Sequence, residues 1–157
     1  TGLLGGAAEL LTEHRDQRRL ILEGEVDMAG AVEELLRLTS PVQGLARTTT
    51  RDVTLRGRTI PAGRKVLLLY ASANRDESQF GADAEELDLR RNIDRMLTFG
   101  YGAHHCLGAA AARLQARVAL EELLRLCPDF EVDAADGEFA AGNYVRRYSR
   151  LPFRAGS

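Results

Sequence analysis

The sequence predicts a mainly α-helical fold with small β-sheets. Three observations support this prediction. Apolar residues recur at helical spacing over residues 3–38 and 107–126, short β-branched stretches lie between residues 45 and 70, and the composition is that of a globular protein. Of the 157 residues, 45% are hydrophobic and 28% are charged, which is enough apolar material for one core of ordinary size and too little for two.

Helical periodicity opens the chain. Apolar side chains at helical spacing predict a first helix over residues 3–11, and a short second helix carries Leu20–Leu22 and ends at Gly24. Met28–Leu38 is predicted as a third helix, with apolar positions on one face. Ser40-Pro41 then stops this helix, because the residue before a proline disfavours the helical conformation.

The pattern changes to β-structure from Leu45 to Tyr70. Strands are predicted at Thr48–Thr54 and Arg58–Ile60, separated by a turn at Arg56-Gly57. The apolar run Val66–Tyr70 predicts a buried strand.

The second half of the chain begins with a long polar stretch. Asn74–Thr98 is predicted to be an irregular surface loop, longer than loops without a functional reason. Leu107–Leu126 is the longest predicted helix, ended by Cys127-Pro128. Phe130–Val132 and Tyr144–Phe153 are predicted as two further strands.

Charge, cysteine content and hydropathy exclude several classes of function. The net charge of −2 gives no general attraction to nucleic acid or to anionic lipid, and two cysteines make no disulfide framework. No apolar run approaches the roughly 18 residues of a membrane-spanning helix, and Thr1–Leu4 lacks the features of a signal peptide. We therefore expect a cytoplasmic protein with no nucleic-acid partner and no membrane association.

The most unusual segment is FGYGAHHCLG, residues 99–108, which leads directly into the long helix. A phosphate-binding loop would need a preceding strand and a different glycine spacing. A zinc site fails because the adjacent His104, His105 and Cys106 cannot all point at one metal. A Cys/His nucleophile pair is chemically possible but lacks an orienting third group, and a buried structural cysteine leaves the glycines and the histidine unexplained.

Haem-thiolate chemistry accounts for the whole segment. Cys106 directly precedes the helix, whose positive dipole end stabilises negative charge on sulfur, and a thiolate is a strong iron ligand. A flat macrocycle that lies against the backbone requires positions without side chains, here Gly100, Gly102 and Gly108.

Two further side chains fit this interpretation. Phe99 can shield the sulfur from water, and His104 can donate a hydrogen bond to a haem propionate. The small residues Ala109–Ala112 allow the helix to pack closely beneath the ring.

The segment FGYGAHHCLG, followed by AAAAR, resembles the cysteine-loop signature of cytochromes P450, Phe-Gly-x-Gly-x-His-x-Cys-x-Gly. Glu34 and Arg37 resemble the family's Glu-x-x-Arg motif, and Arg91 falls where a loop arginine completes the Glu-Arg-Arg triad. Alone, the first two would form a surface pair worth at most about 0.5 kcal/mol; within the family they imply a buried network. Arg47 resembles the arginine that pairs with a haem propionate.

The resemblance implies a parent protein that is a soluble bacterial cytochrome P450. Such a protein binds haem b through Cys106, hydroxylates a small organic substrate with O2, and takes electrons from a ferredoxin and its reductase. Residues 1–157 match only the C-terminal part of that fold, from the end of the central helix through the C-terminal strands, so we expect a single C-terminal fragment. The oxygen-activating acid and alcohol are expected upstream of Thr1, which leaves no catalytic residue in the chain.

The fragment alone is therefore expected to be inactive. The alternative is that it serves as a non-enzymatic truncated module without a complete haem pocket. By resemblance, the turns at Val42, Gln43, Asn143 and Tyr144 contact substrate. Arg113 and Arg117, i and i+4 on the long helix, are predicted to form an exposed stripe that docks an acidic electron donor.

Overall fold

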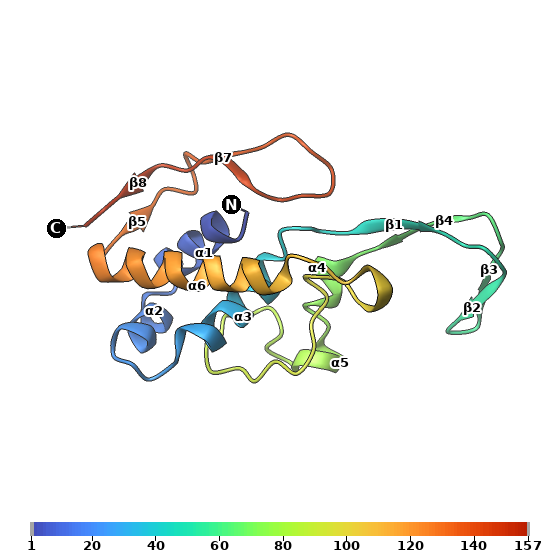
Figure 1. Ribbon diagram of the computed structural model, residues 1–157, viewed down its shortest axis with the longest axis horizontal. Coiled ribbons are helices and arrows are strands. Elements are labelled where there is room, and N and C mark those ends of the chain that lie inside the picture. Colours follow the sequence, from blue (N-terminus) through green and yellow to red (C-terminus); the bar gives the residue numbers. More distant parts are fainter. Residues whose placement is uncertain (1, 157) are drawn as a thin grey trace.

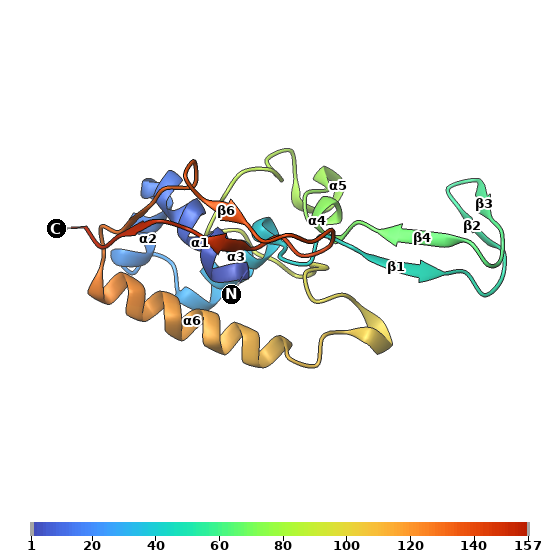
Figure 2. The same cartoon turned by 90° about the horizontal axis from the view of Figure 1, so that it is seen from above.

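Three helices form the body of the protein in this computed structural model, which describes residues 2–156. They are α1 (Gly2–Glu13), α3 (Met28–Thr39) and α6 (Ala109–Leu126). A long β arm extends from this body, and the C-terminal strands cross over α1 (Figures 1 and 2). The mainly α-helical fold with small β-sheets is confirmed, as are the three N-terminal helices, of which the second is α2 (Arg15–Leu22).

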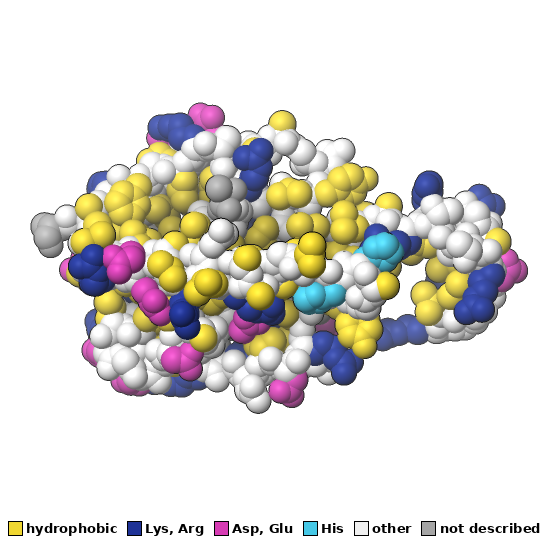
Figure 3. All heavy atoms as spheres, in the orientation of Figure 1, with side chains coloured by type: hydrophobic (Ala, Val, Ile, Leu, Met, Phe, Trp, Pro, Cys, Tyr) yellow, Lys and Arg dark blue, Asp and Glu magenta, His cyan; other side chains and the backbone are white. Residues whose placement is uncertain are grey.

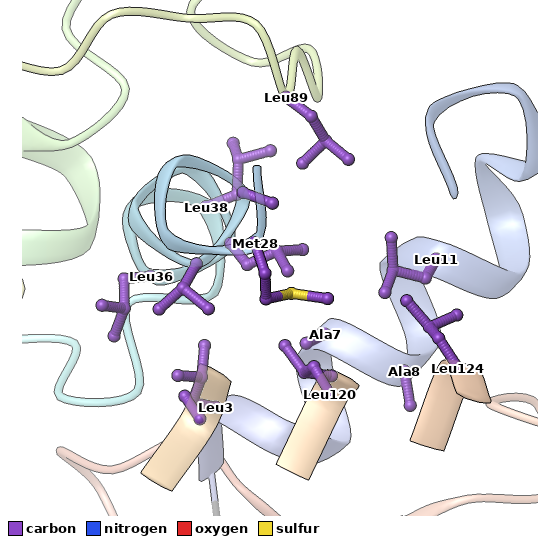
Figure 4. Packing of buried hydrophobic residues seen from close by; sticks show 14 of the residues in the cluster. Leu3, Ala7, Ala8, Leu11, Met28, Leu36, Leu38, Leu89, Leu120 and Leu124 are labelled. Carbon is purple, nitrogen blue, oxygen red and sulfur yellow. The ribbon is translucent and has the colours of Figure 1, made fainter. Parts of the chain in front are cut away.

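The core lies where α1, α3 and α6 meet. Each helix contributes apolar residues spaced three or four apart, so that they share one face. Figure 4 shows these side chains converging between the helices. The buried apolar residues of the three helices include Leu3, Ala7, Leu11, Ala31, Leu35, Leu38, Ala116, Leu120 and Leu124.

Side chains fix both ends of α3. The Asp27 carboxylate accepts a hydrogen bond from the backbone N–H of Gly30 at 2.8 Å, which caps the first turn. Ser40 adopts a left-handed conformation with φ of 34° and ends the helix. Its hydroxyl donates to the carbonyl of Arg37 at 2.7 Å, so this uncommon backbone conformation is supported locally.

The arm consists of two antiparallel pairs. Strand β1 (Leu45–Thr48) pairs with β4 (Lys65–Leu68), and β2 (Val53–Leu55) pairs with β3 (Arg58–Ile60) beyond it. The registers place Leu45 opposite Leu68 and Val53 opposite Ile60. Figure 2 shows the β2–β3 hairpin at the far end of the arm, away from the helices.

Two predictions for this region are wrong. A continuous strand over Thr48–Thr54 does not form, because Thr49 and Asp52 bond across the arm instead: the Thr49 hydroxyl donates to the carbonyl of Pro61 at 2.6 Å, and Asp52 accepts from the N–H of Ala62 at 2.8 Å. The run Val66–Tyr70 is not a buried strand either. Its strand ends at Leu68, and Leu67 is 50% exposed, because a two-stranded arm offers no second layer to cover it.

Residues 74–98 are largely irregular, as predicted. Two short helices flank the start of this stretch, α4 (Tyr70–Ala73) and α5 (Glu77–Phe80), and Asp76 caps the second by accepting from the N–H of Ser78 at 2.9 Å. A 3₁₀ turn, η1 (Gly102–His104), then precedes α6. Helix α6 begins at Ala109 and not at the predicted Leu107, since a turn at Cys106 comes first.

Four short strands end the chain. Strand β5 (Glu131–Val132) pairs with β8 (Phe153–Arg154), and β6 (Glu138–Phe139) pairs with β7 (Tyr148–Arg150). The predicted single strand over Tyr144–Phe153 is therefore wrong. The chain changes partner at Leu151-Pro152, where proline cannot donate to a ladder.

Arg18 ties α2 to this C-terminal region. Its buried guanidinium donates to the carbonyl of Phe130 at 2.6 Å and lies 5.0 Å from the centre of the Phe130 ring. Burial lowers the pKa of Arg18, and the nearby Arg15 lowers it further. Across residues 2–156, no helix combines the length and the apolar character needed to cross a membrane.

Candidate haem-binding site

Cys106 lies in a turn that joins the irregular segment to α6. Its N–H donates to the carbonyl of Phe99 at 2.9 Å, and its own carbonyl accepts from the N–H of Ala109 at 3.2 Å. These two bonds close the loop of residues 99–106 and hold Cys106 directly before the first turn of the helix. Cys106 is a free, exposed cysteine, so Phe99 does not by itself cover the sulfur within the described chain.

The first two glycines of the loop are required by backbone conformation. Gly100 has a φ of 72° and Gly102 a φ of 71°, in the left-handed region that side chains disfavour. A Cβ at Gly100 would meet the nearest atoms only at 3.8 Å, so lack of space is not the reason. Gly108 has an ordinary φ of −84° at the start of α6.

A cavity of about 730 Å³ opens beside the loop. Its wall is mostly apolar and comes from α1, α3, β1, the loop and α6. Cys106, Gly100 and Phe99 line the loop side of this cavity. The other lining residues include Leu3, Leu4, Leu36, Val42, Leu45, Tyr70, Ala112 and Ala116.

Two basic side chains line the same cavity, Arg47 from β1 and His104 from the loop. The Arg47 guanidinium donates to the carbonyl of Ala46 at 2.9 Å, and no carboxylate within residues 2–156 pairs with it. A thiol on one wall and a free guanidinium on another suit a flat, apolar ligand with an acidic edge. Gly102 and Gly108 do not line the cavity.

Glu34, Arg37 and Arg91 form one network between α3 and the irregular segment that precedes the loop. Glu34 and Arg37 are fully buried, and two parallel hydrogen bonds of 2.7 Å join the carboxylate to the guanidinium. Arg91 approaches the same carboxylate at 3.3 Å and also binds Asp83 through both terminal nitrogens. The hydrogen bonds and charges of Asp83 and Glu34 outweigh partial burial and raise the pKa of Arg91.

Arg37 also organises the irregular segment through backbone carbonyls. It donates to the carbonyls of Asn74 at 2.8 Å, Ala84 at 2.6 Å and Glu86 at 3.1 Å. Each N–H group of the guanidinium therefore has an acceptor. The three carbonyls fix the irregular segment to α3 at Asn74, Ala84 and Glu86.

Asn74 is a residue of the site that the sequence reasoning missed. Its buried side chain donates to the hydroxyls of Ser40 at 2.8 Å and Thr98 at 2.9 Å, and accepts from the N–H of Leu97 at 2.7 Å. The Thr98 hydroxyl in turn donates to the carbonyl of Leu36. Asn74 thus connects the end of α3 to the start of the cysteine loop. The signal in the sequence is the run Ala73-Asn74-Arg75-Asp76, which resembles runs at this place in bacterial cytochromes P450 but assigns no role to the asparagine.

Arg113, predicted to form an exposed stripe with Arg117, is half-buried, and its side chain has partners within the chain. Its guanidinium binds both carboxylate oxygens of Glu33, at 2.5 and 3.0 Å, and lies 4.6 Å from the centre of the Phe99 ring. Arg113 thus contacts α3 and the loop while 38% of its side chain stays exposed, against 47% for Arg117. Arg117 approaches Glu121 at 3.7 Å.

The predicted substrate-contacting residues come from two segments that the structure brings together. Val42 forms an isolated bridge with Val145, and the N–H of Gln43 donates to the carbonyl of Tyr144 at 2.7 Å. Val42 lines the cavity, whereas Gln43, Asn143 and Tyr144 lie outside its wall. The Gln43 amide is turned back to the carbonyl of Ser40.

A zinc site formed by several side chains was one of the alternatives. Within the described residues, no three His, Cys, Asp or Glu side chains converge as they would around a metal ion. The acid and alcohol expected upstream of Thr1 lie outside the described residues.

Comparison with known proteins assigns the family. The family model described as Cytochrome P450 matches residues 28–138, a span that contains the buried network and the cysteine loop. The chain belongs to the cytochrome P450 family. Members of this family bind haem. The sulfur of Cys106 is exposed in a chain that contains only part of the P450 fold.

Three known P450s illustrate the relationship. Cytochrome P450 130 of Mycobacterium tuberculosis is 64% identical over 157 residues, which is all of this chain and 39% of that protein. A steroid C26-monooxygenase of Mycolicibacterium smegmatis is 39% identical over 95% of this chain and 37% of its own length. The structure of the tirandamycin C-bound P450 monooxygenase TamI superposes with a TM-score of 0.92 at 37% identity, over 99% of this chain and 39% of TamI. The chain therefore spans about two fifths of the P450s that it matches.

Proposed function

We propose that the full-length protein containing this chain is a haem-thiolate monooxygenase that hydroxylates a small organic substrate with O2. The observation that carries the proposal is the position of Cys106, on the wall of a large apolar cavity and directly ahead of α6. Membership of the P450 family and the names of monooxygenases among the relatives support it.

Cys106 would hold the haem iron as a thiolate. The free N–H groups at the start of α6 and the positive end of its dipole favour negative charge at this point of the chain. The N–H of Cys106 is already used by the carbonyl of Phe99, which fixes the direction of the residue. The backbone on both sides of the sulfur is thus fixed by hydrogen bonds.

Arg47 and His104 would receive the acidic edge of haem b. Both line the cavity, and the Arg47 guanidinium has free donors for a carboxylate. Gly100 would lie against the macrocycle because it lines the cavity without a side chain. For Gly102 and Gly108 we propose a role in the turn itself, not in contact with the ring.

When bound, haem supplies the place where O2, two electrons and two protons are converted into a hydroxylated substrate and water. The acid and alcohol that would guide those protons are expected outside this chain. The residues present here therefore hold the cofactor and shape its pocket, and the chain alone is inactive as an oxygenase. A non-enzymatic module is the alternative, and the exposed Cys106 is the feature that favours it.

We further propose an apolar substrate. The cavity wall is apolar, one relative is named for a steroid and another structure holds tirandamycin C. Val42 would contact the substrate directly, while Gln43, Asn143 and Tyr144 would act at the edge of the pocket, where the two segments are bridged.

Electrons would come from a ferredoxin and its reductase in the cytoplasm. Of the two arginines predicted to dock the donor, Arg117 is exposed and remains a candidate. Its attraction to an acidic protein would act mainly on the association rate and weaken with salt.

The test compares the two cysteines in the full-length protein. Cys106→Ser is expected to abolish the red-shifted Soret band of the reduced carbonyl complex, whereas Cys127→Ser is expected to retain it. Cys127 is the matched control because it lies at the opposite end of α6, packs against the core and does not line the cavity. Equal loss of the band in both variants would refute the proposal.

A further inference from the structure

Arg113 lies where α6 passes the cysteine loop, and its contacts reach in two directions. The guanidinium forms a forked pair with Glu33 of α3, with N–O distances of 2.5 and 3.0 Å. Its central carbon also lies 4.6 Å from the centre of the Phe99 ring. The hydrogen bond to Glu33 raises the pKa of Arg113, so the guanidinium stays charged.

Phe99 connects this pair to the candidate iron ligand. Its carbonyl accepts the hydrogen bond from the N–H of Cys106 at 2.9 Å, and its ring lines the cavity together with Cys106. The ring is only partly buried and packs against the edge of the core. Two side chains flank this ring: the Arg113 guanidinium at 4.6 Å and the His105 imidazole, whose ring centre lies 6.4 Å away. The guanidinium is the closer of the two and makes a cation–π contact.

We propose that Arg113 is a positioning residue for the Cys106 loop. Glu33 orients the guanidinium, the guanidinium holds the Phe99 ring, and the ring fixes the cavity wall beside the sulfur. This inference rests on the proposed haem-thiolate function. It goes beyond electron-donor docking, because the contacts of Arg113 with Glu33 and Phe99 lie within the chain and need no partner protein.

The planar fork of arginine is important to this role. Two parallel bonds to one carboxylate fix the plane of the guanidinium, which a lysine ammonium cannot reproduce. Arg125, on the same helix, also binds one glutamate, Glu122, through two nitrogens at 3.1 and 2.6 Å. That pair is exposed and does not contact the loop, so it provides a matched control.

The experiment uses the full-length protein with Arg113→Gln, Arg113→Lys, Phe99→Leu, the Phe99→Leu/Arg113→Gln double variant and Arg125→Gln. The rate at which the reduced carbonyl complex loses its red-shifted Soret band reports on thiolate ligation. Arg113→Gln is expected to increase this rate by about 2-fold to 30-fold, the range of a cation–π contact. Arg113→Lys should give an intermediate rate, and Arg125→Gln the wild-type rate.

The double variant decides whether Arg113 acts through the ring. It is expected to lose the band no faster than Phe99→Leu alone, because the guanidinium then has no ring to hold. The proposal would be overturned if the double variant lost the band at a rate that combines the increases of both single variants. A wild-type rate for Arg113→Gln would also overturn it.

A second measurement does not depend on bound haem. In a Cys127→Ser background, the rate of Cys106 alkylation by iodoacetamide is measured on full-length protein purified without added haem. Arg113→Gln and Phe99→Leu should both slow alkylation several-fold, because Cys106 is already exposed and would lose its fixed place before the positive end of α6. Arg125→Gln should not change the rate, and an unchanged rate for Arg113→Gln would overturn the proposal. If the wild-type protein showed no thiolate spectrum at all, the proposed function would fail, while the order of alkylation rates would still decide the role of Arg113.

Discussion

Replacing Arg37 by alanine removes the centre of the buried network. The guanidinium makes two bonds to Glu34 and three to backbone carbonyls, and its side chain is fully buried. After substitution, Glu34 keeps only Arg91 at 3.3 Å and the N–H of Asp88 at 3.1 Å. Breaking a buried ion pair from one side costs about 3 to 5 kcal/mol, because the remaining charge stays buried.

That loss is large against the stability of a whole domain, which is about 5 to 15 kcal/mol. Urea unfolding of the full-length protein should therefore show a free energy of unfolding lower by about 3 to 5 kcal/mol. Haem content after purification should fall as well, because Arg37 holds the carbonyls of Asn74 and Ala84 that order the approach to the loop.

Two controls separate the loss of the buried network from the effect of removing any arginine. Arg125→Ala removes an exposed pair with Glu122 on α6 and should leave the unfolding midpoint unchanged. The double variant Glu34→Gln/Arg37→Met should be more stable than Arg37→Ala, since it removes both charges and fills the space. A free energy of unfolding for Arg37→Ala within about 0.5 kcal/mol of wild type would show that the network contributes no more than a surface pair.

Three further substitutions test other parts of the structure. Asn74→Ala loses three side-chain hydrogen bonds and should lower the free energy of unfolding by about 1.5 to 4.5 kcal/mol in urea titrations; wild-type stability would contradict its linking role. Gly100→Ala should lower the free energy of unfolding by about 1 to 2 kcal/mol, because φ is 72° at this position. Gly30→Ala, within α3, should leave this free energy unchanged or raise it. A change of the same sign in both variants would argue against backbone strain at Gly100. Burial, and then the neighbouring Glu9, raises the pKa of Tyr148 to about 12 in the folded protein. The unfolded chain loses the same proton near pH 10, so the free energy of unfolding should fall as pH rises from about 10 to 12. Tyr148→Phe should remove that component of the pH dependence, and an identical profile would refute it.

The sequence predicts the helices well because their signal is local. Apolar spacing along α1, α3 and α6 identifies the buried face without knowledge of the partner helix. The strands are harder to predict because pairing depends on distant residues. Thr49 and Asp52 look like strand residues until their partners across the arm are known, and the division of Tyr144–Phe153 follows from pairing with both β5 and β6.

The same distinction applies to the site. The cysteine loop is contiguous, so its residues could be found from the sequence, and the i, i+3 spacing of Glu34 and Arg37 marked them as a pair. Asn74 and Glu33 were missed because their partners lie far along the chain: Asn74 binds Thr98, and Glu33 binds Arg113. The contacts of Arg113 were missed for the same reason, since helical spacing alone does not show which neighbour lies beside that part of α6.

The chain also leaves apolar surface uncovered on α6. Figure 3 shows hydrophobic side chains along this helix and between it and the C-terminal strands. Leu107 is fully exposed, and Leu114 and Val118 are 54% and 46% exposed. Since the chain spans 39% of its relative cytochrome P450 130, we expect stability measurements to be meaningful only in the full-length protein.

One helix holds the cysteine loop from both sides. Adjacent residues on a helix point about 100° apart, so Glu33 and Glu34 reach different neighbours. Glu33 binds Arg113 on α6, after the loop, while Glu34 binds Arg91, before it. The carbonyl of Leu36, further along α3, accepts from Thr98 at the start of the loop. Both ends of the loop are therefore anchored to α3, and the position of Cys106 is determined by these anchors even though its own side chain is exposed.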